Sequence, residues 1–196
     1  MSDYNIIKIQ KKLKKELDEE RFIHTEGVMY TAASLAMCHD EDVTRTCVAG
    51  LLHDCAKCIP NAQKLRLCGH YKVPVSPVER AAPHLLHAKL GACIAKDKYG
   101  VEDPEILSAI SCHTTGKPDM TLLEKIIFLA DYIEPGRVKA PNLARIRHLA
   151  FSDIDLAVYM TLRDTLAYIK EKKAPLDNQS LVAYNYYKNF IGETED

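Results

Sequence analysis

Several histidines and aspartates in this chain have the type and setting of metal ligands. His53 and Asp54 are adjacent, at the end of the strongly apolar segment AGLL. Neighbouring side chains on a helix diverge by about 100°, so a buried imidazole and carboxylate at these positions converge only on something that lies between them. A cation fills that place and leaves neither buried group unpaired. The pair therefore predicts a metal site.

The His–Asp pair also has a simpler interpretation, as a surface pair at a helix C-terminus, where a protonated imidazole interacts favourably with the helix dipole. Four further residues favour the metal. His24 lies on a helix face of small residues, His87 begins the run HAKLGA, and His113 ends a helix. Asp131 interrupts the apolar run IIFLADYI, and an unpaired buried carboxylate there would cost several kcal/mol. Each histidine alone could equally fill a core or capping role, whereas the whole set indicates a shared ion.

Helices are expected to position these residues. Apolar residues recur at helical spacing through most of the chain, Asp3 is available to cap the first helix, and Thr121 with Glu124 forms a capping box. Residues 69–83 contain three prolines, which predict a surface loop. Strand-like alternation is not seen in the sequence, so the expected fold class is all-α. The helices are expected over residues 6–17, 21–38, 42–56, 83–99, 103–113, 122–133, 142–150, 153–172 and 180–191.

Composition limits the partners that the protein is expected to have. A chain of 196 residues is expected to form one domain. Its 26 basic and 27 acidic residues nearly cancel, so nucleic acid is not an expected partner. No segment approaches the ~18 uninterrupted apolar residues of a membrane span, so no membrane association is expected. Seven scattered cysteines are typical of reduced thiols and favour a cytoplasmic location.

The order of the histidines and aspartates along the chain resembles that of the HD-domain superfamily of metal-dependent phosphohydrolases. A closer resemblance is to the bacterial YqeK family of symmetrical bis(5′-nucleosyl)-tetraphosphatases, through the combination of HTxG, HD, LLHxKxGA, HTTG and ADYIEPxR motifs. The strings that carry it are HTEGVMYTAASLA, AGLLHDCAK, HLLHAKLGA, ILSAISCHTTGKPDM and LLEKIIFLADYIEPGR. The resemblance implies a single HD domain over residues 1–196, with its core motifs at about 21–137 and C-terminal helices at about 142–191 completing the bundle and the nucleotide pocket.

The resemblance also implies roles for individual residues. The implied metal ligands are His24, His53, Asp54 and Asp131, and the implied catalytic residues are His53, Asp54, His87 and His113. The implied contacts to ADP come from Arg21, His24, His87, His113, Thr114, Asp131 and Arg137. A less well matched segment, with Ala174, Pro175 and Leu176, is implied to contact the nucleoside.

The implied ligand set mixes nitrogen and oxygen donors, which suit iron, manganese or zinc better than magnesium. Iron is the expected metal, and manganese, zinc, cobalt and nickel are alternatives. Such an ion polarises phosphorus and lowers the pKa of water. His87 and His113 then either hold a second metal bridged through Asp54 or donate hydrogen bonds to phosphate oxygens and the departing ADP. Lys57 and Arg137 are expected to neutralise polyphosphate.

The expected function is hydrolysis of diadenosine tetraphosphate into two ADP by metal-activated water, with a small nucleotide as the partner. One alternative is another HD-family phosphohydrolase, such as a nucleotidase, a deoxynucleotide triphosphohydrolase or a phosphodiesterase. A second alternative is a nucleotide-binding module without turnover. A homodimer is left open.

Overall fold

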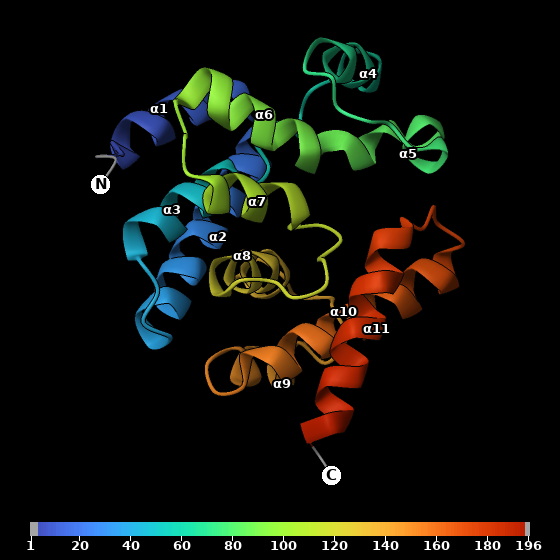
Figure 1. Ribbon diagram of the computed structural model, residues 1–196. Coiled ribbons are helices and arrows are strands. Elements are labelled where there is room, and N and C mark those ends of the chain that lie inside the picture. Colours follow the sequence, from blue (N-terminus) through green and yellow to red (C-terminus); the bar gives the residue numbers. More distant parts are fainter. Residues whose placement is uncertain (1–3, 195–196) are drawn as a thin grey trace.

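The protein is described by a computed structural model that places residues 4–194, and all regular elements within that range are helices (Figure 1). This confirms the all-α fold class. The elements are α1 (Ile6–Glu16), α2 (Glu19–Cys38), α3 (Val43–Leu52), α4 (Asn61–His70), α5 (Pro77–Ala81), the 3₁₀ helix η1 (Pro83–Leu86), α6 (His87–Tyr99), α7 (Pro104–Cys112), α8 (Leu122–Ile133), α9 (Leu143–Ala150), α10 (Ile154–Lys172) and α11 (Asn178–Thr194).

Helix α8 lies at the centre of the fold, where it contacts α2, α3, α7, α9 and α10. In Figure 1 it is seen almost end-on, between α2 and α7 on one side and the C-terminal helices on the other. The predicted capping box is present: Thr121 Oγ1 accepts from Glu124 N, and the Glu124 carboxylate accepts from Thr121 N. Most of the helix is buried, so Asp131, on its last turn, is held in position by the core.

Helices α2 and α3 approach each other closely at Gly50. A Cβ added to Gly50 would lie 3.0 Å from the Met29 Cα, so only glycine fits between the two backbones. This approach brings together His24 on α2 and His53 at the end of α3, whose ring centroids are 5.4 Å apart. Close backbone packing therefore forms one wall of the site.

The structure corrects several predicted boundaries. The helix expected over residues 42–56 ends at Leu52, and the chain then turns. The loop expected over residues 69–83 is wrong in part, because Ser76 and Glu79 form a capping box and Pro77 takes the first position of α5. Helix α4 was not predicted, and the segment expected as one helix over 83–99 is divided into η1 and α6.

At the start of the chain, Asp3 lies outside the described residues. Asn5 caps α1 instead, since its side chain accepts from Lys8 N at 2.9 Å. Within the described part of the chain, none of the helices is both long enough and apolar enough to cross a membrane.

Candidate metal centre and active site

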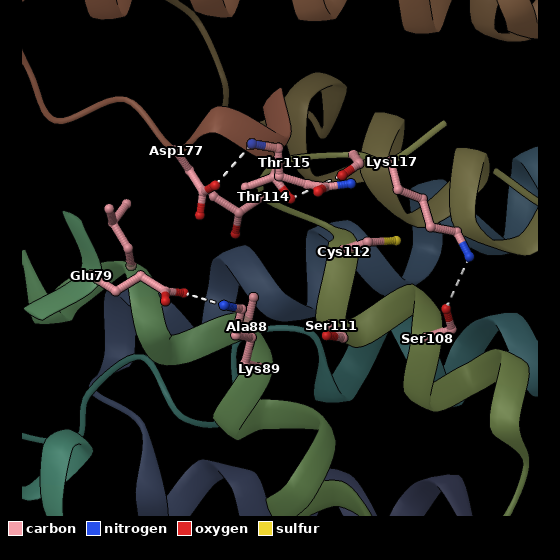
Figure 2. Close-up of a pocket in the computed structure, with 13 residues that line it drawn as sticks. Glu79, Ala88, Lys89, Ser108, Ser111, Cys112, Thr114, Thr115, Lys117 and Asp177 are labelled. Atoms are coloured by element: carbon pink, nitrogen blue, oxygen red, sulfur yellow. Dashed lines mark hydrogen bonds and ion pairs between the residues drawn. The ribbon is translucent and has the colours of Figure 1, made fainter. Parts of the chain in front are cut away.

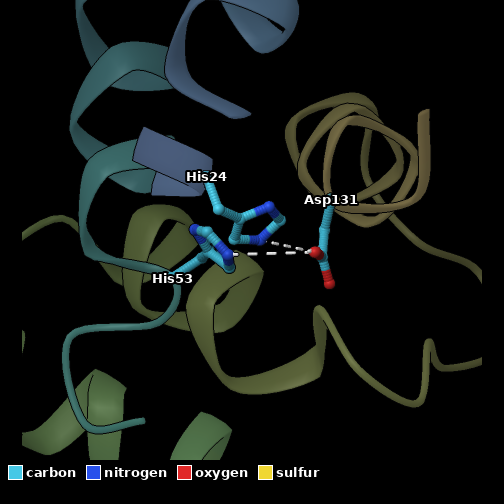
Figure 3. Close-up of side chains that lie close together, drawn as sticks. All are labelled: His24, His53 and Asp131. Atoms are coloured by element: carbon cyan, nitrogen blue, oxygen red, sulfur yellow. Dashed lines mark ion pairs between the residues drawn. The ribbon is translucent and has the colours of Figure 1, made fainter. Parts of the chain in front are cut away.

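The four histidines and two aspartates singled out in the sequence converge on one buried centre. His24 comes from α2, Asp131 from α8, and the other four residues come from the ends or beginnings of three helices. The contacts between them are His24 Nε2–Asp131 Oδ1 at 3.0 Å, His53 Nε2–Asp54 Oδ2 at 3.6 Å, His53 Nε2–Asp131 Oδ1 at 4.0 Å, His87 Nε2–Asp54 Oδ1 at 3.3 Å and His113 Nε2–Asp54 Oδ1 at 3.5 Å. Figure 3 shows His24, His53 and Asp131 pointing toward one another from three different helices or helix ends.

Three of the imidazoles are oriented in the same way, by a main-chain carbonyl at a helix end. His53, His87 and His113 occupy the C-cap positions of α3, η1 and α7. In each ring Nδ1 lies 2.7 Å from the carbonyl oxygen three residues earlier, a group in the last turn that a helix leaves available. A carbonyl only accepts, so Nδ1 carries the proton and Nε2 presents its lone pair to the centre. The helix ends therefore set both the tautomer and the direction of these rings.

The fourth imidazole, His24, is held by a carboxylate. Glu134 is buried, and its Oε1 lies 3.1 Å from His24 Nδ1. Its other oxygen accepts from Gly136 N. A Cβ at Gly27 would lie 2.8 Å from Glu134 Oε2, and one at Gly136 would lie 2.9 Å from Oε1. Both glycines thus leave room for the Glu134 carboxylate, which directs His24 Nε2 toward Asp131.

Two arginines contact the carboxylates of the centre. Arg21 Nη1 donates to Asp54 Oδ2 at 2.9 Å, and Arg137 Nη2 donates to Asp131 Oδ1 at 2.6 Å. Arg137 also donates from Nε to the Asp131 carbonyl oxygen at 2.9 Å. These are the two arginines that the resemblance implies as contacts of ADP.

Lys57 and Thr114 lie on the His87 side of the centre. Lys57 Nζ is 3.0 Å from His87 Nε2 and 3.4 Å from Asp54 Oδ1. Thr114 Oγ1 is 3.2 Å from Nε2 of both His87 and His113. Since His87 Nδ1 is the protonated nitrogen, His87 Nε2 accepts from the lysine. A cation thus already lies beside this half of the centre.

The electrostatics of the site favour metal-binding protonation states. Burial lowers the pKa of His53 to about 4, and burial together with nearby Lys57 lowers the pKa of His87 to about 3. Burial alone would raise the pKa of Asp54, but the neighbouring histidines hold it well below its ordinary value. Burial would also raise the pKa of Asp131, but the contact with His24 and the charges of His53 and His113 together hold it well below its ordinary value. At neutral pH His53 and His87 are therefore neutral and the two carboxylates are ionised, the forms that ligate metals, whereas the pKa of His24 is raised, because its contacts with Asp131 and Glu134 outweigh the effect of burial.

The residues present fit a metal ion. His53 Nε2 is buried and makes no hydrogen bond to any residue that the structure describes, since its nearest carboxylate oxygens lie at 3.6 and 4.0 Å. Asp54 Oδ1 is likewise buried without a hydrogen bond and faces two imidazoles and Lys57 at 3.3 to 3.5 Å. Unpaired buried groups of this kind are costly, and a cation would satisfy them together. Two groups have potential ligand atoms that all lie within 4.8 Å of one another: His24 with His53 and Asp131, and His53 with Asp54 and His113. The two groups share His53, so the four implied ligands adjoin one another.

Of the clefts in the described structure, two lie beside the centre: the first adjoins it through Thr114, next to His87 and His113, and the second is lined by His24. The first is about 290 Å³, is reached past Thr114, and is also lined by Lys89, Asp177 and Gln179. Figure 2 shows its side chains coming from α6, α7 and the segment before α11. The second is about 350 Å³, is reached past His24, and lies between α2 and the connection from α8 to α9. Each cleft is large enough for part of a nucleotide.

The remaining predicted contacts lie less close to the centre. Ala174, Pro175 and Leu176 are exposed in the loop between α10 and α11. They are not among the described residues that line either cleft, although Asp177, the next residue, lines the first. Sequence reasoning missed Glu134 as a partner of His24. The available signal was a carboxylate between an apolar helix and a Pro–Gly turn.

Comparison with known proteins places the chain in a family. Residues 21–136, more than half of the chain, match the family model described as HD domain. The chain therefore belongs to the HD-domain family, and the resemblance noted in the sequence is confirmed. The core motifs of the site all fall inside the matched segment or directly after it.

Within this family, the chain is similar to proteins named symmetrical bis(5′-nucleosyl)-tetraphosphatase. It is 37% identical to the one from Bacillus subtilis (strain 168), over 89% of this chain and 92% of that protein. It is 34% identical to the one from Staphylococcus aureus, over 93% and 94% of the respective chains. A crystal structure from Clostridium acetobutylicum, described as a predicted HD superfamily hydrolase involved in NAD metabolism, matches with a TM-score of 0.90, 36% identity and coverage of 95% and 98%.

Proposed function

We propose that this protein is a metal-dependent hydrolase that cleaves diadenosine tetraphosphate symmetrically into two ADP. The observation that carries the proposal is the convergence of imidazole nitrogens and carboxylate oxygens in two groups that share His53, with the ligand atoms of each group within 4.8 Å of one another, beside two clefts. The names of the relatives support this substrate over those of nucleotidases, triphosphohydrolases and phosphodiesterases. A binding module without turnover would be expected to lack a ligand, and all the implied ligands are present.

His24, His53, Asp54 and Asp131 would hold the metal. The mixed nitrogen and oxygen donors suit iron, manganese or zinc, and iron is the proposed ion because the family resemblance implies it. When bound, the metal supplies Lewis acidity toward a phosphate oxygen and lowers the pKa of water. Arg21 and Arg137 then bind the phosphate chain, since a guanidinium pairs bidentately with phosphate oxygens.

His87 and His113 are proposed to act on the phosphate chain and the departing ADP. A second metal at these residues would lie next to the Lys57 ammonium, which is 3.0 Å from His87 Nε2. A cation bound by His87 Nε2 would be repelled by this ammonium, so the lysine disfavours a second metal. Because His87 and His113 present Nε2 as a lone pair, they accept hydrogen bonds, and donation to phosphate oxygens would come from Lys57 and Thr114 beside them. Thr114 Oγ1, 3.2 Å from both rings, is placed to donate to a phosphate oxygen in the same region.

The proposed activity is tested by product analysis. Purified protein, supplied with iron, manganese or zinc, is incubated with diadenosine tetraphosphate, and the nucleotides are separated by chromatography. The proposal expects ADP as the only product, at two molecules for each substrate consumed. Equal amounts of ATP and AMP would contradict symmetrical cleavage, and release of orthophosphate from nucleoside monophosphates would favour the nucleotidase alternative.

We expect Glu134→Gln to weaken metal binding by about 10- to 100-fold, because a carboxylate behind a ligating histidine fixes the ring and raises its basicity. The amide keeps the shape of the side chain but loses the charge that faces His24 Nδ1. The measurement is the dissociation constant of the metal, from competition with a chelator of known affinity.

Glu124→Gln is the matched control for that variant. Glu124 is also a buried carboxylate linked to α8, but it pairs with Lys117 and Ser108, away from the centre. Its loss should lower stability and leave metal affinity unchanged. Equal metal affinity in wild type and Glu134→Gln would contradict the role given to Glu134.

A further inference from the structure

The second cleft adjoins the centre and shares Arg21, His24 and Arg137 with it, but no part of the substrate beyond the phosphates has been assigned to it. It is lined on one side by residues of α2, among them Arg21, Ile23 and His24, and on the other by residues 134–137. We propose that this cleft binds the second nucleoside of a dinucleoside polyphosphate, on the opposite side of the metal centre from the first cleft. The inference rests on the proposed function and adds a binding site to it.

Continuity with the centre is the first argument. Arg21 and Arg137 line the cleft and also donate to Asp54 and Asp131, respectively. His24 lines it as well, with its Nε2 directed at Asp131. A phosphate chain held at the centre by the two guanidinium groups therefore has a direct path into this cleft.

The charge pattern of the cleft is the second argument. The cationic groups, Arg21 and Arg137, lie beside the centre, where phosphates would be. The rest of the lining includes the carboxylate of Glu20 and the apolar side chains of Ile23 and Pro135, while the oxygens of Glu134 are already engaged by His24 and Gly136 N. Carboxylates repel phosphate but accept hydrogen bonds from ribose hydroxyls or a base amino group, and apolar side chains suit the face of a base. The lining thus combines cations that contact the centre with apolar side chains and a carboxylate suited to a nucleoside.

The number of clefts is the third argument. A substrate cut at the middle of its phosphate chain has one nucleoside on each side of the scissile bond. The first cleft lies beyond Thr114, next to the loop expected to contact a nucleoside, and the second lies beyond His24. Their volumes, about 290 and 350 Å³, are similar. A substrate with one nucleoside would use only one of them.

Ile23→Asp tests the proposal. Ile23 is 62% exposed, so the change should leave the fold intact, and it removes apolar contact while adding a third carboxylate. We expect kcat/KM for diadenosine tetraphosphate to fall about tenfold, mainly through KM, as for other losses of apolar contact in a binding pocket. Adenosine 5′-tetraphosphate has one nucleoside, which the first cleft can hold, so its inhibition constant as a competitor should be unchanged. Ile23→Ala should give a smaller loss of the same kind.

Tyr30→Asp is the matched control, because Tyr30 is similarly exposed on the same helix and does not line the cleft. Tyr30→Asp should have the wild-type kcat/KM for diadenosine tetraphosphate and the wild-type inhibition constant for adenosine 5′-tetraphosphate. The proposal would be overturned if Ile23→Asp kept the wild-type kcat/KM for diadenosine tetraphosphate. It would also be overturned if the inhibition constant of adenosine 5′-tetraphosphate worsened by the same factor as kcat/KM, because that would mean an effect on the centre that both compounds share. If the wild-type protein cleaves no dinucleoside tetraphosphate, the proposed function fails and this inference fails with it. An active wild type with an unaffected Ile23→Asp variant would therefore reject only the role of the second cleft, whereas an inactive wild type would reject the proposed function.

Discussion

Asp54→Asn should lower turnover of diadenosine tetraphosphate at least ~100-fold while the helical content stays that of the wild type, because activation of water by the metal depends on this carboxylate. Asp54 is the residue on which the site converges: one oxygen faces Arg21, and the other lies within 3.5 Å of His87, His113 and Lys57. Asparagine keeps the volume of the side chain but replaces one acceptor by a donor and removes the charge.

Steady-state kinetics measure the turnover, and circular dichroism measures the helical content. Asp97→Asn is the control, because Asp97 is an exposed aspartate whose carboxylate accepts from Tyr71 Oη at 2.8 Å, outside the site. It should keep wild-type turnover. An Asp54→Asn variant that turns over substrate at the wild-type rate would remove Asp54 from the mechanism.

Removing the metal should abolish turnover, with a loss of at least ~100-fold, and returning iron should restore it. The protein should stay folded without the metal, because a large apolar core of buried residues from most of the helices surrounds α8 independently of the site. Chelation followed by gel filtration gives the metal-free protein. Activity and helical content are then measured before and after the addition of each candidate metal.

Elemental analysis of protein purified without chelator reports how many ions each chain carries. One ion per chain agrees with the role of Lys57 beside His87, whereas two would require that lysine to move away from the second ion. Full turnover in the metal-free protein would reject the proposed mechanism.

Local signals allowed much of the site to be predicted from the sequence. His53, Asp54 and Asp131 stood out because ionisable residues interrupted apolar helical segments, and burial makes such residues expensive unless they are paired. The structure brings them together with His24, His87 and His113. The capping box at Thr121 could also be predicted, because its two residues lie only three positions apart in the sequence.

Long-range features could not be predicted in the same way. Glu134 meets His24 across 110 residues of chain, and neither its sequence context nor its spacing identifies that partner. The second cleft depends on how the segment after α8 lies against α2, which is decided by tertiary packing. Helix α5 was missed because prolines were taken to break structure, whereas Pro77 lies at the position where a helix accepts proline.

The hydrogen bonds that orient His53, His87 and His113 come from main-chain carbonyls, which every amino acid supplies. The side chains at positions 50, 84 and 110 take no part in these hydrogen bonds, so Gly50 and Ile110 are constrained by packing, against Met29 and within the core, and not by the orientation of the rings. Transplanting this arrangement into another helical scaffold would require three helix ends aimed at a common point. The His24 position would also need a carboxylate in the place of Glu134 and a glycine on each side of it, as at positions 27 and 136.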